Sequence, residues 1–226
     1  MYNLDDLKFR RQSWVQSSQI PPKYIGRELS DCTEISPNDM DDILTWMDLV
    51  KSGKVIDVMG TDLAGKGLAL FGAPGQGKTT VAAALVQDLM RTVSLDVFPF
   101  NATQPVFFTT YVKLVNLRGY LMSDYVEGTK EALWESIMGE SKTESRNIKV
   151  LVIDDLGKEF QSASGWQRSI IDEVLRSRYS NCLPTIITSN LPTAEWVKYN
   201  SALASFAQEA FVNIQVKSTQ GDLRAR

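Results

Sequence analysis

The 226-residue sequence contains no histidine and only two cysteines, and these shortages exclude several kinds of site. Without imidazole, the chain cannot form a serine–histidine triad, a histidine general base or a histidine metal ligand. Cys32 and Cys182 are far apart and form no Cys-x-x-Cys motif, which excludes a zinc site or a redox dithiol within the chain. We expect both to be thiols in a reducing cytoplasm.

The sequence also lacks long apolar runs and an excess of positive charge. No stretch approaches the roughly 18 apolar residues of a membrane-spanning helix, and the first residues do not resemble a signal segment. We therefore expect a cytoplasmic protein that does not associate with membranes. The 24 Lys and Arg against 27 Asp and Glu give a net charge of −3, which rules out a globally basic surface for nucleic acid but not a local basic groove.

Strand and helix patterns alternate along most of the chain, which predicts an α/β fold. Short apolar runs alternating with helical patterns indicate a parallel sheet that helices cover on both faces. The strands are predicted at residues 67–71, 105–110, 150–153, 185–188 and 211–216, and the helices at 78–91, 111–123, 129–138, 166–179 and, with an interruption, 194–210.

The segment before the first predicted strand is distinct, and we divide the chain into residues 1–55 and a core of residues 56–226. Residues 1–35 are polar and irregular. Pro21 and Pro22 are incompatible with a continuing helix and indicate an extended arm. For residues 1–18 a disordered terminus is the alternative.

One helix is predicted within the N-terminal segment, from Ser36 to Gly53. Ser-Pro-Asn-Asp at residues 36–39 is a typical helix start, with a capping hydroxyl and a proline in the first turn. Apolar residues follow at helical spacing, at Met40, Ile43, Leu44, Met47 and Val50, and the helix exposes Met40, Trp46 and Met47. They are expected to pack on the core, and the alternative is a contact with a partner protein.

A glycine-rich motif follows the first predicted strand and opens a helix. It matches G-x-x-x-x-G-K-[ST], whose glycines let backbone N–H groups surround a phosphate at a helix N-terminus. Lys78 would place a positive charge between the β- and γ-phosphates, and Thr79 would offer its hydroxyl to Mg²⁺. No Asn-Lys-x-Asp guanine reader is present, so the predicted ligand is ATP with Mg²⁺. The residues of this motif are Gly72, Ala73, Pro74, Gly75, Gln76, Gly77, Lys78, Thr79 and Thr80.

Two further strands end in polar side chains that we expect beside this loop. Asp154 and Asp155 follow an apolar strand, and ligands bind at the carboxyl ends of strands in open α/β sheets. Asp154 is predicted to hold Mg²⁺ and Asp155 to polarise an attacking water; the alternative for Asp155 is a cap of the next turn. Asn190 follows another strand and could reach the γ-phosphate or the water, unless it is a plain turn residue.

These segments resemble two groups of AAA+ proteins, the DnaC/DnaI-type replicative helicase loaders and the IstB-type transposition helper ATPases. The similarity lies in GAPGQGKTT at 72–80, VLVIDDLG at 150–157 and PTIITSNL at 184–191, with IPPKY at 20–24 before them. It implies an αβα AAA+ P-loop NTPase core, a five-stranded parallel sheet in the order 5-1-4-3-2, and little or no C-terminal lid domain. The small size resembles a phage or mobile-element version.

The resemblance also implies roles for individual residues. Asp155 would be the catalytic acid, Asn190 the sensor 1 residue, and Arg224 in the closing Gly-Asp-Leu-Arg segment a contact to the γ-phosphate. For Arg224 the alternative is a solvated basic tail. The sequence departs from these relatives at residues 201–210, which contain no Arg or Lys where an arginine finger is usual. We therefore expect slow hydrolysis, or a finger from a partner or from Arg176 or Arg178.

The function implied by the resemblance is ATP-dependent loading or remodelling of a hexameric replicative DNA helicase on single-stranded DNA. Self-association through the AAA+ core is a further expectation. Tyr111, Lys113 and Arg118 lie on or beside one helix and are the candidate DNA contacts; the alternative is an ordinary solvated helix face. A transposition helper acting on duplex DNA and a P-loop small-molecule kinase are the alternative functions.

Overall fold

A computed structural model places the five strands in one parallel sheet. It describes residues 3–53, 65–122, 128–156, 165–198 and 201–218. The strands lie side by side in the order β2-β3-β4-β1-β5, which read from the other edge is the predicted 5-1-4-3-2. The predicted α/β fold is confirmed. Their bounds are β1 Gly67–Phe71, β2 Val106–Thr110, β3 Val150–Leu156, β4 Thr185–Ser189 and β5 Phe211–Gln215.

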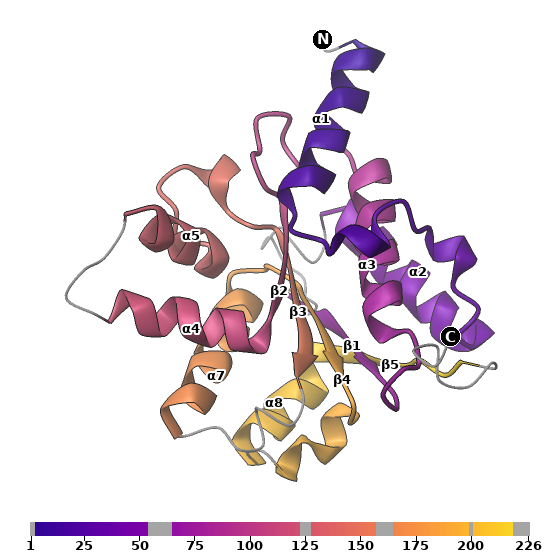
Figure 1. Cartoon of the computed structure of the whole chain (residues 1–226), viewed down its shortest axis with the longest axis vertical. Helices are drawn as coiled ribbons and strands as arrows, with labels where there is room; N and C mark the ends of the chain where they lie inside the picture. The colour runs from indigo at the N-terminus through magenta and orange to yellow at the C-terminus, as the bar shows by residue number, and fades with distance from the viewer. Residues whose placement is uncertain (1–2, 54–64, 123–127, 157–164, 199–200, 219–226) are drawn as a thin grey trace.

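Helices cover both faces of this sheet (Figure 1). One layer contains α1 (Leu4–Ser17), α2 (Pro37–Lys51) and α3 (Lys78–Thr92). The other contains α4 (Tyr111–Leu121), α5 (Gly128–Met138), α7 (Gly165–Ser180) and α8 (Ser201–Ala210), with the 3-10 helix η4 (Thr193–Lys198) before α8. The helical pattern predicted at residues 194–210 thus corresponds to two described elements, η4 and α8.

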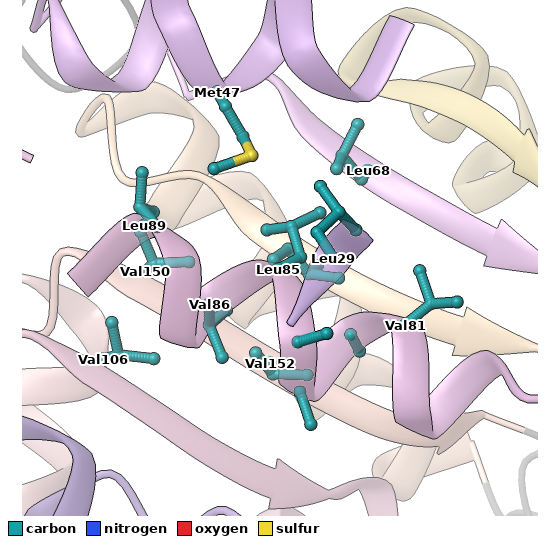
Figure 2. Packing of buried hydrophobic residues seen from close by; sticks show 14 of the residues in the cluster. Leu29, Met47, Leu68, Val81, Leu85, Val86, Leu89, Val106, Val150 and Val152 are labelled. Carbon is teal, nitrogen blue, oxygen red and sulfur yellow. The ribbon is translucent and has the colours of Figure 1, made fainter. Parts of the chain in front are cut away.

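Each strand contributes to both faces because successive side chains of a strand point in opposite directions. Val150 and Val152 of β3 belong to the hydrophobic cluster under α3, while Leu151 and Ile153 belong to the cluster under α4, α5, α7 and α8. Figure 2 shows the first cluster, in which side chains of α2, α3 and the sheet meet. Burial on both faces explains why the strands read as continuous apolar runs.

The first residues form a helix, so the prediction of an irregular arm or disordered terminus is wrong for residues 4–17. Asn3 caps α1 by accepting the N–H of Asp6, and Asp5 and Asp6 lie in its first turn. Trp14 is fully buried, and its indole Nε1 donates to the carbonyl of Ala102 at 2.8 Å. A cap followed by acidic residues was the signal available in the sequence.

The chain after α1 is ordered along α3 and the edge of the sheet. The backbone carbonyl of Ser18 accepts the N–H of Phe108, a residue of edge strand β2, at 2.7 Å. Residues Pro22–Tyr24 form one turn of 3-10 helix. The expectation of a fully extended arm is wrong there, because proline is compatible with the first turn of a helix. Gln87 of α3 is buried and binds this segment, accepting the N–H of Gly26 at 2.8 Å and donating to the carbonyl of Tyr24 at 2.9 Å.

Helix α2 begins where the capping signal predicts, with Ser36 accepting the N–H of Asp39. Trp46 and Met47 are buried in the cluster under α3, which confirms packing on the core, and Met40 is half-buried beside it. Residues of α1 and α2 thus share one hydrophobic cluster with α3 and the sheet. None of the helices in the described residues is long and apolar enough to cross a bilayer.

Candidate functional site

The glycine-rich loop, β3 and β4 bring four predicted site residues together at the carboxyl edge of the sheet. Lys78, the first residue of α3, is nearly buried. Its ammonium donates to the carbonyl oxygens of Gly72 at 2.7 Å and Ala73 at 2.9 Å, and to Oδ1 of Asn190 at 3.1 Å. The lysine of the loop and the asparagine that follows β4 are therefore in contact at this edge.

The loop between β1 and α3 has a shape that only its glycines allow. Gly77, the N-cap of α3, has a φ of 93°, a left-handed conformation that other residues rarely adopt. A Cβ on Gly72 would lie 2.2 Å from the carbonyl oxygen of Val216, so a side chain there would displace the strand end next to the loop. Gln76 also contacts the segment after β5, accepting the N–H of Ser218 at 2.7 Å.

Thr79 and Asp154 form the second part of the site. The Thr79 hydroxyl lies 3.0 Å from Oδ1 and 3.2 Å from Oδ2 of Asp154. The Thr188 hydroxyl donates to the same Oδ1 at 2.6 Å. Burial raises the pKa of Asp154, and the hydrogen bonds from Thr188 and Thr79 oppose that effect.

Asp155 differs from its neighbour in both exposure and backbone conformation. Its side chain is exposed, and its φ is 59°. The register of β3 against β4 shifts at this point, from Ile153 opposite Ile187 to Leu156 opposite Ser189, so β3 has one extra residue. This bulge extends β3 three residues beyond the predicted strand, and both acids lie within it.

The donors present fit a magnesium ion held together with a nucleotide. Mg²⁺ prefers oxygen ligands and is usually bound through one or two carboxylates, substrate phosphates and water rather than by an all-protein cage. Thr79 and Asp154 supply a hydroxyl and a carboxylate within hydrogen-bonding distance of each other, next to Lys78. In the described part of the chain, no group of three His, Cys, Asp or Glu residues could hold a metal without such a ligand.

The three arginines that the sequence suggested as positive charges near the nucleotide differ in position and burial. Arg224 lies outside the described residues. Arg178 is a residue of α7 and is fully buried, so the suggestion of a finger at this position is wrong. Arg176 is on the surface of α7, where it pairs with Asp172 at 2.9 Å and its guanidinium lies over the ring of Phe206.

The candidate DNA contacts on α4 also differ from one another. Tyr111 is only 3% exposed, so its ring is not available to stack on a base and this candidate is wrong. Lys113 is exposed. Arg118 is partly exposed, 4.9 Å from the ring centroid of Trp134 and 3.8 Å from a carboxylate oxygen of Glu173.

Sequence reasoning missed the part that Thr188 plays in this site. Besides its bond to Asp154, the Thr188 hydroxyl accepts the backbone N–H of Asp155 at 2.8 Å, so one side chain contacts both acids. The available signal was a hydroxyl residue near the end of an otherwise apolar strand, directly before the Ser-Asn pair.

Comparisons with known proteins agree with this geometry. The family described as "IstB-like ATP binding protein" matches residues 62–207. The replicative helicase loader DnaI of Bacillus subtilis is 26% identical over 195 residues, which are 84% of this chain and 52% of that protein. The phage-like element PBSX protein XkdC of the same organism is 29% identical over 142 residues, 61% of this chain and 45% of that protein.

Solved structures of AAA+ replication proteins share the fold. The match to the crystal structure of the DnaC helicase loader covers 87% of this chain and 99% of the DnaC chain, with a TM-score of 0.59 and 21% sequence identity. At this identity the likeness establishes the fold alone. The chain spans about half the length, or less, of the curated relatives that it matches.

Proposed function

The chain belongs to the IstB-like ATP-binding protein family, and from this we propose that it is an ATP hydrolase that loads or remodels a replicative DNA helicase on single-stranded DNA. The observation that carries the proposal is the contact of Lys78 with Asn190 beside the Thr79–Asp154 pair. Residues from three separate segments meet at the carboxyl edge of the sheet, where α/β folds bind ligands. The likeness to a helicase loader over 84% of the chain supports the choice of partner.

Each polar group of the site has a distinct part in the proposed hydrolysis. The loop N–H groups and Lys78 would bind the β- and γ-phosphates, and Thr79 and Asp154 would hold Mg²⁺, which would neutralise charge on the phosphates. The exposed carboxylate of Asp155 would orient the attacking water. Asn190 would donate its amide N–H to the γ-phosphate or the water, while its oxygen contacts Lys78 as it does in this structure.

Turnover by the chain alone is expected to be slow. α8 carries no Arg or Lys, and Arg178 is buried in the fold. An arginine finger contributes roughly 10³–10⁵ in rate where one is present. Among the two arginines suggested on α7, Arg176 is the one at the surface and is the candidate finger toward a neighbouring copy.

The proposed DNA surface lies on α4 and α5. Exposed Lys113 and partly exposed Arg118 provide positive charge on α4. Lys130 of α5 lies 3.2 Å from the ring centroid of Tyr120, which adds a second basic–aromatic pair on the same helices. Mixed basic and aromatic side chains suit single strands, whose phosphates and unpaired bases are both accessible.

The test is binding of labelled single-stranded and duplex DNA by the wild-type chain and by Lys78→Ala, with ATP and with ADP, at two salt concentrations. We expect tighter binding to single strands with ATP, weaker binding at higher salt, and no effect of ATP on Lys78→Ala. An equal affinity for DNA in both nucleotide states would contradict the proposal. Pull-down of a hexameric helicase with ATP, absent for Lys78→Ala, tests the partner.

The surface itself is tested by the double variant Lys113→Glu/Arg118→Glu. The matched control is Lys142→Glu/Arg146→Glu, which changes the charge equally at two exposed positions elsewhere. The first variant should bind DNA at least tenfold more weakly and bind ATP normally, whereas the control should bind DNA like the wild type. Equal losses in the two variants would mean that net charge rather than this surface decides DNA binding.

The family name supports a second candidate, a transposition helper that acts on duplex DNA. The same binding experiment separates the two. A preference for duplex over single strands with ATP would favour the transposition helper and would replace the helicase as the expected partner.

A further inference from the structure

Thr188 has an unusual position, because its hydroxyl connects the two acids of the site. It is 1% exposed and lies one residue before the end of β4. The hydroxyl donates to Oδ1 of Asp154 at 2.6 Å and accepts the backbone N–H of Asp155 at 2.8 Å. A hydroxyl has one hydrogen to donate and lone pairs to accept, so both bonds form at once.

The bond to Asp155 falls where the backbone is strained. A φ of 59° is uncommon for a residue other than glycine, and such conformations persist only when their surroundings hold them in place. The bulge also interrupts the regular pairing of the backbone N–H groups of β3 with the carbonyls of β4. The Thr188 hydroxyl supplies an acceptor for the N–H of the strained residue, which holds the backbone that carries the Asp155 carboxylate.

The bond to Asp154 orients the carboxylate that faces Thr79. Thr79 reaches both oxygens of Asp154 at 3.0 and 3.2 Å, whereas Thr188 reaches Oδ1 alone. The two hydroxyls differ in what they can do when Mg²⁺ binds. The Thr79 oxygen would be a ligand. Thr188, on the neighbouring strand β4, would keep Asp154 in place.

We propose that Thr188 is a positioning residue that sets Asp154 for metal binding and Asp155 for orienting water. This role rests on the proposed ATP hydrolysis. Thr188 would touch neither phosphate nor metal, and its effect would pass through the two acids. Removing the hydroxyl should therefore impair Mg²⁺-dependent steps and leave nucleotide binding without Mg²⁺ nearly unchanged.

The experiment compares wild type with Thr188→Val, which keeps the shape and removes the hydroxyl, and with Thr188→Ser, which keeps the hydroxyl. The control is Thr185→Val, a buried threonine at the opposite end of the same strand whose hydroxyl binds Arg178. The readouts are mant-ATP binding in EDTA, the Mg²⁺ midpoint of mant-ATP binding, kcat and thermal stability. Thr188→Ala is made in parallel in case the valine variant does not fold.

We expect Thr188→Val to bind mant-ATP in EDTA within about twofold of wild type, to need at least tenfold more Mg²⁺, and to lose at least tenfold in kcat. Thr188→Ser should stay within about threefold of wild type. Thr185→Val should lose thermal stability and keep its Mg²⁺ midpoint and kcat. Any loss of function in Thr188→Val would then follow from the hydroxyl and not from general destabilisation.

Two outcomes would overturn the proposal, and they can be told apart from failure of the proposed function. A Thr188→Val protein with wild-type Mg²⁺ midpoint and kcat would remove the role, as would a serine variant as impaired as the valine variant, which would indicate packing. A wild-type chain that neither binds mant-ATP nor hydrolyses ATP would instead overturn the proposed hydrolysis, and with it the role of Thr188.

Discussion

Replacing Arg178 by methionine should destabilise the fold strongly without changing the chemistry of the site. The Arg178 side chain is fully buried, and burial lowers its pKa to about 9. Each of its five N–H groups has an acceptor. Nε donates to the Thr185 hydroxyl at 3.1 Å, and the two terminal nitrogens donate to the backbone carbonyls of Ile137, Ile148, Lys149 and Pro184.

The magnitude follows from the groups left behind. Methionine fills much of the space but donates nothing, so four backbone carbonyls and one hydroxyl lose a buried donor. A buried acceptor without a partner costs about 1–3 kcal/mol. The Pro184 carbonyl keeps the N–H of Leu151, and removing a desolvated charge offsets part of the remaining sum, which leaves a net cost on the order of 3–5 kcal/mol. We expect the free energy of unfolding to fall by that amount.

The assay is urea unfolding followed by tryptophan fluorescence, with Arg176→Met as the control. Arg176 lies on the same helix with a partly exposed side chain, and its pair with Asp172 should contribute less than about 1 kcal/mol. A loss below about 1 kcal/mol in Arg178→Met would refute the reasoning. A stable Arg178→Met protein with greatly reduced hydrolysis would restore Arg178 as a charge donor to the nucleotide.

Three further predictions concern the layer of α1, α2 and α3 and the segments between these helices. Trp14→Ala should lower the free energy of unfolding by about 3–5 kcal/mol in urea, because it removes a fully buried indole and its bond to Ala102. Burial raises the pKa of Cys32 to about 12, so the free energy of unfolding that the protonated thiol contributes should be present below pH 9 and decline as the pH rises from there toward 12. A disulfide reagent at pH 8 should label Cys32 quickly only in urea. Gln87→Leu should increase tryptic cleavage at Lys23 and Arg27 at least threefold, because the Tyr24–Gly26 turn loses both of its bonds to α3, whereas exposed Gln16→Leu should not.

The sheet and the loop could be predicted because their signals are local. Apolar strands, the glycine-rich motif and the Ser36 cap depend on neighbours within a few positions, and the structure places them as expected. The same holds for the places of Asp154, directly after the apolar part of β3, and of Asn190, directly after β4. Their contact with Thr79 and Lys78 follows from the parallel topology, which brings the carboxyl ends of all strands to one edge.

The N-terminal arm could not be predicted in the same way, because what orders it is distant in the sequence. Trp14 is anchored by the carbonyl of Ala102, and the turn at Tyr24–Gly26 by Gln87. A polar segment without periodicity reads as irregular when only its own residues are considered. Its order comes from the Gln87 side chain of α3 and a backbone carbonyl of the loop after α3, which only the fold brings close.

The bulge in β3 shows the same limit within the candidate site. If the register continued regularly from Ile153 opposite Ile187, Asp155 would lie opposite Ser189. The β3 side chain at that position is buried. The extra residue puts the fully buried Leu156 there instead, and the carboxylate of Asp155 remains exposed at the edge. Register between two strands is a tertiary property, and the Thr188 hydroxyl that supports the bulge is 33 positions away from Asp155. The sequence can therefore predict that two acids follow a strand, but their different environments, on which the different chemical parts proposed for them rest, depend on a single inserted position in the register with the neighbouring strand.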